Sequence, residues 1–549
     1  MAELLTPGIQ VAEQPGPEHA IARASTAVTA FIGRSLRGPC HQPVAVTTFG
    51  DFQHTFGGLW QPSMLGYAIE QFFENGGRQA IVVRVANGAQ PKTLTLRAQR
   101  STLTLEALCP GTREYLRASV DYDSIGENEA DRFNLVVQRI RTPGSEYIED
   151  QEIYRRLSVD PVNGRSYVPL ALAESRLVRM IGEVPPERPD RTLHPHGGLI
   201  GYVASNPDGD DGDVPSDYDI IGSATESTGL HALRSVDLFN FLCIPPLARD
   251  TDVGPSALMV AARLCRERRA MLIVDPPAAW TTAGEALEAM RDWYFASPNA
   301  LMYFPRVIAY DRLRGRHETF APGGAVAGML ARLDEVWPVW SPAEGEDALL
   351  RAGYRPVCPV SEQERARLTQ AGVNTLQTVR SSVRLGLSPR TLAGPGSESP
   401  DWKYLSARRL ALFIVNSIER GTRWVLFEHN GPELWRRVRA RVEEFFAGLE
   451  AGGAFLGSDP NESYFVVCDE RLNDEGPDSV GRVRLLIGFA AARPGEYHSY
   501  LITHNAAGSR SERVSYNRLL SANYRLDPAE PAEPAAIDDS VVRKPAVGG

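Results

Sequence analysis

The sequence is short of cysteine, lysine and long apolar runs, and the shortages of cysteine and of apolar runs each argue against a class of protein. Its six cysteines are widely spaced and include no C-x-x-C pair, which argues against a disulfide scaffold or a zinc cluster and indicates reduced thiols. The longest apolar runs, such as Leu410–Val415, fall far below the roughly 20 residues that span a bilayer. Residues 1–8 lack the basic and apolar regions of a secretory signal. We therefore expect synthesis in the cytoplasm and no direct membrane binding.

An excess of positive charge is also missing. The chain has 58 basic and 68 acidic residues, a formal net charge of −10, which predicts no general affinity for nucleic acid. Lys92, Lys403 and Lys544 are the only lysines, so nearly every basic residue is an arginine. Arginine suits specific, bidentate ion pairs at interfaces, although a GC-rich coding sequence would produce the same bias. With 43% hydrophobic residues, the chain is predicted to fold into roughly three or four globular domains.

Motifs for catalysis are missing as well. The sequence contains no phosphate-binding loop, dinucleotide fingerprint, zinc-protease helix or serine-hydrolase elbow. The glycine-rich segment 323–328 lacks a phosphate-binding lysine, so close helix packing explains it better. Carboxylates in segment 208–219 could bind calcium, but their spacing is not that of an EF-hand loop and favours a surface turn. His194 and His196 supply two imidazoles without a further ligand. We therefore expect no enzyme, cofactor or metal site.

The first 24 residues have the pattern of an arm. Ile9 and Val11 alternate with Gln10 and Ala12 up to Glu13, and prolines on both sides isolate this short strand from the next element. A strand without a local partner pairs at a distance or adds to another chain's sheet.

The remaining sequence predicts a multidomain α/β (α+β) fold. Its α/β core would be built from N- and C-terminal parts, with a β-rich insertion domain and extended terminal arms. Strands alternating with helices predict a mainly parallel, covered sheet. The predicted parts are the arm (1–24), the N-terminal core (25–91), the insertion (92–234), the central α/β domain (235–400), the C-terminal domain (401–504) and an extension (505–549) that is disordered from about 527.

Several individual elements can be predicted by residue range. The predicted core strands are 26–34, 79–86, 237–244, 270–275 and 300–310, and the predicted helices are 62–75, 255–267, 283–295 and 324–333. In the C-terminal domain, helices are expected at 402–420 and 432–448, and strands at 423–428, 463–468, 482–490 and 497–503, the last strand of the fold.

The helix predicted at 432–448 is amphipathic. One face is apolar, while Arg436, Arg437, Arg439 and Arg441 lie with Glu443 and Glu444 on the other. This pattern fits an ordinary solvated helix, or a docking face for an acidic partner on which arginines pair with carboxylates.

An ordered set of segments resembles the contractile tail sheath proteins of phage tails, tailocins and contractile injection systems. The set covers roughly the first 90 residues and most of 235–503. The segments are 7–13 (PGIQVAE), 26–35, 43–58, 65–77, 80–85, 322–328, 345–347, 371–375, 402–410, 418–430, 465–470 and 488–497. Segment 382–392 departs from the family pattern because it lacks the family's tryptophan, and the chain continues past the usual final strand.

The resemblance implies a structural subunit rather than an enzyme. Sheath subunits form stacked hexameric rings around an inner tube and contract without nucleotide, attached to baseplate, tail-terminator and sometimes paralogous sheath proteins. Terminal arms add strands to neighbours' sheets, which here implies Ile9–Glu13 and a C-terminal strand with Tyr497, Ser499, Leu501 and Thr503. The insertion would face outward and the arginine helix the tube. A non-contracting baseplate or cap-end relative, and an α/β enzyme with an unrecognised site, remain the alternatives.

Overall fold

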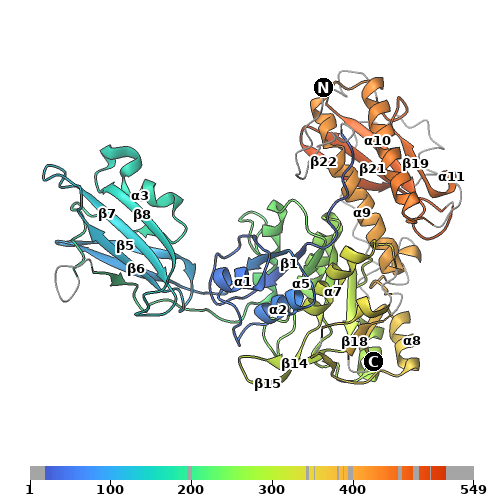
Figure 1. The fold of residues 1–549 in the computed structure, drawn as a ribbon, viewed down its shortest axis with the longest axis horizontal. Helices are drawn as coiled ribbons and strands as arrows, with labels where there is room; N and C mark the ends of the chain where they lie inside the picture. The colour runs from blue at the N-terminus through green and yellow to red at the C-terminus, as the bar shows by residue number, and fades with distance from the viewer. Residues whose placement is uncertain are drawn as a thin grey trace, which may run out of the picture. The chain divides into compact units, whose positions relative to one another are not determined.

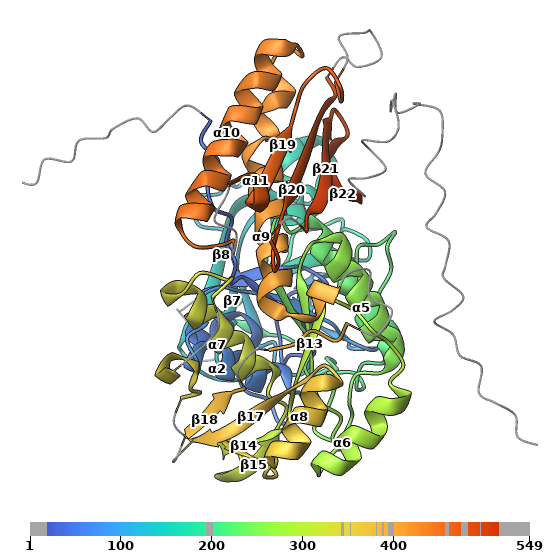
Figure 2. The same cartoon turned by 90° about the vertical axis from the view of Figure 1, so that its right-hand side faces the viewer.

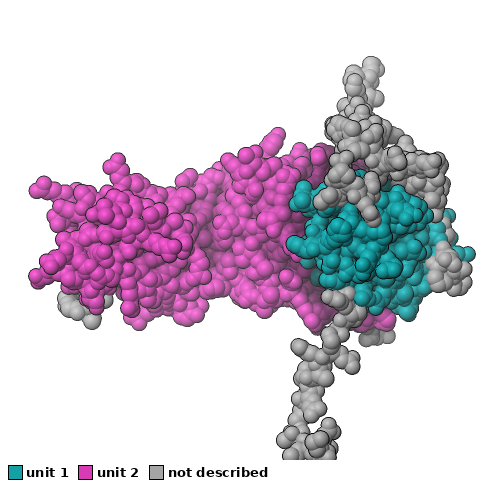
Figure 3. All heavy atoms as spheres, turned by 90° about the horizontal axis from the view of Figure 1, so that it is seen from above, with its two compact units in different colours: residues 1–26, 339–342, 398–549 teal, residues 27–338, 343–397 magenta. Residues whose placement is uncertain are grey.

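The structure is a computed structural model in which the chain divides into two compact units (Figure 3). The core unit contains residues 27–338 and 343–397, and the C-terminal unit contains residues 1–26, 339–342 and 398–549. The described residues are 19–193, 201–341, 345–351, 353–379, 382–386, 389–393, 400–455, 460–473, 481–494 and 496–514. The predicted arm strand and the predicted disordered tail therefore lie outside the described residues. No helix in the described part of the chain is long and apolar enough to cross a membrane.

An eight-stranded sheet forms the centre of the core unit. Its order is β18-β17-β13-β12-β11-β1-β3-β2, and all neighbours are parallel except the edge strands β2 and β18. The strands are β1 (Thr29–Gly33), β2 (Val44–Val46), β3 (Ala80–Arg84), β11 (Phe241–Cys243), β12 (Met271–Val274), β13 (Ala300–Phe304), β17 (Val373–Val379) and β18 (Ser382–Leu385). The predicted parallel, covered sheet is confirmed, since β1, β3, β12 and β13 are buried along their whole length.

Helices cover both faces of this sheet (Figures 1 and 2). They are α1 (Phe49–Phe56), α2 (Leu65–Glu74), α4 (Asp217–Ile221), α5 (Pro255–Glu267), α6 (Ala283–Ala289), α7 (Gly323–Val336) and α8 (Glu362–Gln370). In β1, Phe31 contacts Phe72 of α2 with ring centroids 5.4 Å apart. Ala30 and Ile32 instead join a cluster that includes Leu258 of α5. This alternation follows from the two-residue period of a strand.

Most core elements agree with their predictions, but one helix and one strand do not. The helix predicted at 283–295 ends earlier, since α6 stops at Ala289 and a 3₁₀ turn runs only to Asp292. The segment predicted as one strand, 300–310, forms two strands, β13 and β14 (Val307–Asp311). Pro305 separates them, and β14 joins a small sheet with β15 (Arg316–Phe320) and β16 (Arg355–Pro356). Because proline donates no backbone hydrogen bond, it marks this break in strand pairing.

Two glycines of α7 allow it to pack directly against the backbone of α2. A Cβ atom on Gly324 would lie 2.1 Å from the carbonyl oxygen of Ala68. A Cβ atom on Gly328 would lie 2.1 Å from the carbonyl oxygen of Phe72. These clashes confirm the interpretation of segment 323–328 as a site of close helix packing.

We expect Gly328→Ala to destabilise the core unit by about 3 kcal/mol, because overpacking against a fixed backbone forces the two helices apart. Thermal unfolding should show a lower midpoint for this variant. The matched control is Gly284→Ala in α6, where the nearest atom would be 3.9 Å away. The control should unfold at or slightly above the original temperature, since alanine favours helix. Equal midpoints for the two variants would contradict the packing argument.

The segment between β3 and α4 forms two antiparallel sheets. One has the order β10-β6-β7-β8 and the other β4-β5-β9. The strands are β4 (Pro91–Ala98), β5 (Ser101–Pro110), β6 (Leu116–Asp121), β7 (Arg132–Ile140), β8 (Ile148–Ser158), β9 (Val178–Ile181) and β10 (Val203–Ala204). Alternate residues of both sheets share one hydrophobic cluster, which includes Leu94, Leu103, Val120 and Phe133. The short helix α3 (Val168–Ala171) packs beside them.

Three buried arginines of the core connect this two-sheet segment to the central sheet. Arg84 donates to the carbonyl oxygens of Gly38 (2.6 Å) and Pro110 (2.8 Å). Arg37 forms an ion pair with Glu149, with 2.6 Å between Nη1 and Oε2. Arg34 donates to the backbone of the acidic segment 208–219. The β-rich segment is therefore attached through buried polar contacts, which are specific in geometry.

The C-terminal unit packs helices on an antiparallel sheet of order β19-β20-β21-β22 (Figure 2). Its elements are α9 (Leu405–Gly421), α10 (Pro432–Ala451), α11 (Pro460–Ser463), β19 (Tyr464–Val467), β20 (Val483–Phe489), β21 (His498–Asn505) and β22 (Gly508–Val514). The prediction of a strand at 423–428 is wrong, because residues 423–427 form the 3₁₀ helix η7 (Arg423–Phe427). The prediction of 497–503 as the last strand is also wrong, since β22 follows it.

A buried histidine joins three parts of this unit. The ring nitrogens of His504 in β21 lie 2.8 Å from the Thr422 hydroxyl and 2.7 Å from the Ser509 hydroxyl of β22. The Thr422 hydroxyl donates to the carbonyl oxygen of Ile418, so it accepts from His504. Burial, with a smaller effect of the Arg423 charge, lowers the pKa of His504 to about 4.

The C-terminal unit should therefore lose stability in acid. An unfolded histidine has a pKa of about 6.5, above the folded value, so the contribution of neutral His504 is complete above that pH. It decreases as the pH falls towards 4, by about 3 kcal/mol in total. Urea unfolding between pH 7 and pH 4 should show this slope, and His504→Gln should flatten it. An unchanged slope in the variant would contradict the assignment.

Candidate functional site

The predicted arginine face lies on α10, the long helix of the C-terminal unit. The helix begins with Gly431 as N-cap and Pro432 in its first turn, where a missing N–H is tolerated. Its buried residues follow helical spacing and anchor one face in the hydrophobic core of the unit; they are Leu434, Trp435, Val438, Val442, Phe445, Phe446 and Leu449. The opposite face is left to charged side chains.

The four arginines of this face differ in their partners. Arg437 pairs with Glu428 at 2.9 Å, Arg439 with Glu443 at 2.8 Å, and Arg441 with Glu444 at 2.9 Å. Arg436 is exposed and, among the described residues, has no ion-pair partner. Exposed pairs of this kind contribute about 0.3–0.5 kcal/mol each, so they hold the side chains in place only weakly.

An exposed phenylalanine, which no sequence pattern indicated, lies just before this helix. Phe427, the last residue of η7, is 91% exposed, more than any other large hydrophobic side chain in the described chain. A strand at 423–428 would have suggested alternate burial, whereas the 3₁₀ turn directs Phe427 outward. The 418–430 segment contained the residue, but no periodicity marked it as exposed.

The first described residues lie against the same part of the C-terminal unit. The ring of His19 stacks on Trp424 of η7 with centroids 4.1 Å apart, and the guanidinium of Arg437 lies 5.5 Å from that indole. Ala24 N–H donates to the Ser417 hydroxyl of α9 at 3.0 Å. Ile21 packs on Gly421, where a Cβ atom would come within 2.8 Å of it. Residues 19–24 are thus held on the unit, and the predicted arm strand precedes this anchor.

The predicted C-terminal arm residues lie on or next to β21. Ser499 is opposite Gly488 and Val514, Leu501 is opposite Leu486 and Glu512, and Thr503 is opposite Arg484 and Arg510. Tyr497 precedes the strand. Both edges of β21 are therefore paired within the chain, and the sheet ends instead at β19 and β22.

The acidic segment 208–219 uses its carboxylates as local hydrogen-bond acceptors. Asp208 accepts from the backbone N–H of Thr93 at 2.9 Å, and Asp211 accepts from Thr112 N–H at 2.7 Å. Asp217 accepts from Gly254 N–H at 2.8 Å, at the start of α5. These contacts give the segment a structural role in holding the β-rich segment and α5. The pair His194 and His196 lies outside the described residues.

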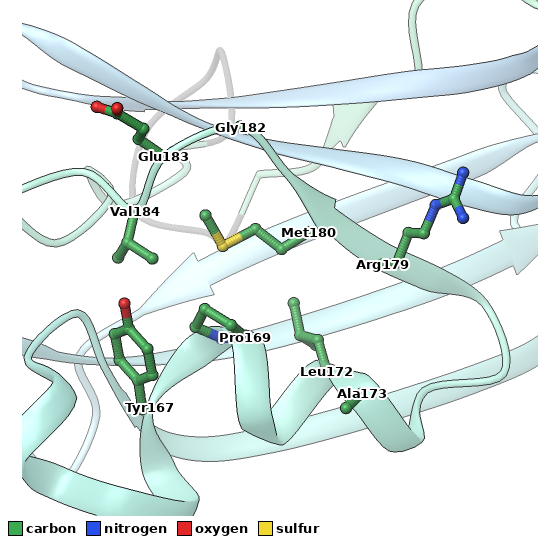
Figure 4. A pocket seen from close by; sticks show the side chains of 9 residues that line it. All are labelled: Tyr167, Pro169, Leu172, Ala173, Arg179, Met180, Gly182, Glu183 and Val184. Atoms are coloured by element: carbon green, nitrogen blue, oxygen red, sulfur yellow. The ribbon is translucent and has the colours of Figure 1, made fainter.

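Two hollows can be described among the placed residues of the core unit. The larger, about 460 Å³, lies between β9 and the α3 region, with Met180 pointing into it and Leu172 below (Figure 4). The smaller, about 110 Å³, lies after β11 and β12 and contains Asp252 and Asp275. Within the described ranges, no group of three or more histidine, cysteine or acidic side chains could hold a metal ion.

The chain is similar to known proteins in one domain of its sequence and over most of its fold. Residues 397–499 match the family model of the phage tail sheath C-terminal domain. A sheath tail protein of Listeria innocua has a TM-score of 0.60 at 12% identity, covering 88% of this chain and 96% of that chain. A sheath tail protein of Desulfitobacterium hafniense has a TM-score of 0.51 at 12% identity, covering 92% and 99%. No protein with curated annotation matches significantly in sequence.

A further match is a sheath from an extracellular contractile injection system, the PVC sheath complex in its contracted state. It has a TM-score of 0.51 at 16% identity, covering 90% of this chain and 96% of that one. The predicted multidomain α/β architecture is confirmed. Residues 397–499 thus match the phage tail sheath C-terminal domain and the chain has the fold of tail sheath proteins, which confirms the resemblance stated from the sequence.

Proposed function

We propose that this chain is the structural sheath subunit of a contractile, phage-tail-like particle. Its copies polymerise as stacked hexameric rings around an inner tube, and contraction drives the tube through a target envelope. The subunit is made in the cytoplasm and acts within the assembled particle. Its partners are other copies, the inner tube protein, and the baseplate and tail-terminator proteins.

One observation carries this proposal. The likeness to sheath proteins extends over about nine tenths of the chain and nearly the whole length of each relative. An enzyme that had borrowed one domain of the fold would match only in part. A heterologous contact repeated along an axis generates a tube rather than a closed oligomer.

Strand addition at the ends of the C-terminal sheet is proposed as the link between subunits. The strand Ile9–Glu13 of one copy pairs with an outer edge, at β19 or β22, of a neighbour's sheet. The anchor at residues 19–24 supports this, because it fixes where the arm leaves its own unit. β21 could serve as an exchanged arm only if it separated from both of its partner strands, β20 and β22. The arm residues concerned would be Tyr497, Ser499, Leu501 and Thr503.

The exposed face of α10 is proposed as the contact with the inner tube. Arg436, Arg437, Arg439 and Arg441 offer bidentate donors to carboxylates, and Phe427 adds an apolar anchor beside them. Weak internal ion pairs leave these arginines available for a partner that carries more acidic groups.

A non-contracting baseplate or cap-end relative is the second candidate, favoured by the extension beyond the C-terminal sheet. Electron microscopy of the chain together with its inner tube protein distinguishes a sheath from a baseplate or cap-end protein. A sheath gives long cylinders around the tube, whereas a baseplate or cap protein gives single rings at its ends.

A further inference from the structure

A small cavity lies where ligands bind in open parallel sheets, at the carboxyl ends of adjacent strands. It follows β11 and β12, holds about 110 Å³, and reaches the start of α5. Most of its wall is apolar, formed by Ile244, Pro246, Val253, Pro255, Leu258 and Pro277. Its polar lining residues are Asp252, Asp275, Trp293 and Tyr294.

Asp275 provides an uncommitted carboxylate oxygen. Its Oδ1 accepts the backbone N–H of Gly323 at 2.7 Å, where a Cβ atom on Gly323 would be equally close. Its other oxygen has no hydrogen-bond partner among the described residues. The charge of Arg306 acts on Asp275, but Arg306 is ion-paired with Asp252 and donates Nε–H to the carbonyl oxygen of Pro276 at 2.9 Å.

In the described part of the chain, Asp275 forms no ion pair of its own. Burial raises its pKa to about 7, although Arg306 and the Gly323 N–H act in the opposite direction and the Asp252 charge adds to the rise. The pKa of the Cys243 thiol in β11 is raised by burial and, to a smaller extent, by the charge of Asp275. A bound cation would restore the ionised form.

Trp293 provides the complementary donor. Its indole N–H is buried and meets no acceptor among the residues that the structure describes, while its ring packs edge-on against Trp280 with centroids 5.4 Å apart. A buried donor left without a partner costs about 1–3 kcal/mol. A ligand that supplies an acceptor would recover that cost, and the indole face attracts a cation.

We propose that this cavity binds a small amino alcohol, a compact organic cation that carries one hydroxyl group. The ammonium pairs with the free oxygen of Asp275, and the hydroxyl oxygen accepts from the Trp293 indole. The apolar wall of Leu258 and the prolines surrounds the short carbon chain. The proposal does not depend on assembly of the chain into a sheath.

Isothermal titration of the full chain with ethanolamine tests this site. We expect saturable binding of ethanolamine. Propylamine, which lacks the acceptor, and 1,2-propanediol, which lacks the charge, should each bind at least about tenfold more weakly. Binding should strengthen as the pH rises through 7, since Asp275 becomes ionised. Absence of binding, as for a cavity that holds only water, would overturn the proposal.

Two variants test the proposed contacts of ethanolamine with Asp275 and Trp293. Asp275→Asn should weaken ethanolamine binding at least about tenfold, and Trp293→Phe should remove the advantage of ethanolamine over propylamine. Trp293→Phe keeps the ring, so it remains informative if Asp275→Asn fails to fold. Unchanged ethanolamine binding in Asp275→Asn, or an unchanged preference in Trp293→Phe, would contradict the assignment.

Discussion

Deleting residues 1–18 should abolish polymerisation while leaving a folded subunit. The deletion removes the predicted strand Ile9–Glu13 but ends before His19, which stacks on Trp424 of the C-terminal unit. We propose main-chain pairing along these five residues as the link between copies. Sedimentation of the purified chain should show at least about a tenfold loss of pelleted polymer.

Two double variants distinguish the loss of main-chain pairing from the loss of the Ile9 and Val11 side chains. The double variant Ile9→Pro and Val11→Pro removes backbone donors and should behave like the deletion. The double variant Ile9→Ala and Val11→Ala keeps every backbone donor and should retain polymer. Polymer formation by the deletion, or equal loss in both double variants, would contradict strand addition.

Reversing charge on α10 should separate the subunit from the inner tube. The double variant Arg436→Glu and Arg439→Glu would place like charges against the acidic partner that we propose for this face, and such a juxtaposition costs on the order of several kcal/mol. Co-sedimentation with purified inner tubes should fall at least about tenfold. Both side chains are exposed in the free unit, so its thermal unfolding should change little.

The matched control is Arg493→Glu, on the loop between β20 and β21, which is 59% exposed and pairs with Glu496 at 3.3 Å. It should leave tube binding unchanged. Phe427→Ser tests the apolar anchor separately and should weaken tube binding without affecting the fold. Equal binding by the α10 double variant and the Arg493 control would place the tube contact elsewhere.

The parallel core could be predicted because its local signals agree. Strands such as β12 are continuous apolar runs, and helix α5 begins at Pro255, as its sequence pattern predicts. The prediction of a strand at 423–428 was wrong because a short apolar run is compatible with either a strand or a buried turn. The turn is favoured over the strand because Val425 packs in the core and Trp424 packs against His19, which is far away in the sequence.

The candidate surfaces could be predicted only in part. Helical spacing was enough to place the α10 arginines on one face, because periodicity decides which residues are exposed. Exposure of Phe427 depends on the 3₁₀ turn, and the pairing of β21 on both sides depends on β22, a strand of low hydrophobicity. The cavity at Asp275 is lined by residues from the ends of two strands and from an aromatic segment distant in the sequence. No spacing in the sequence indicates that these residues lie close together.

Electron microscopy of the intact chain co-expressed with its inner tube protein tests the central claim most directly. The sheath proposal predicts long hollow cylinders around the tube, built of stacked rings with six-fold symmetry, that are lost when residues 1–18 are deleted. A small, monodisperse particle in the presence of assembled tubes would contradict it.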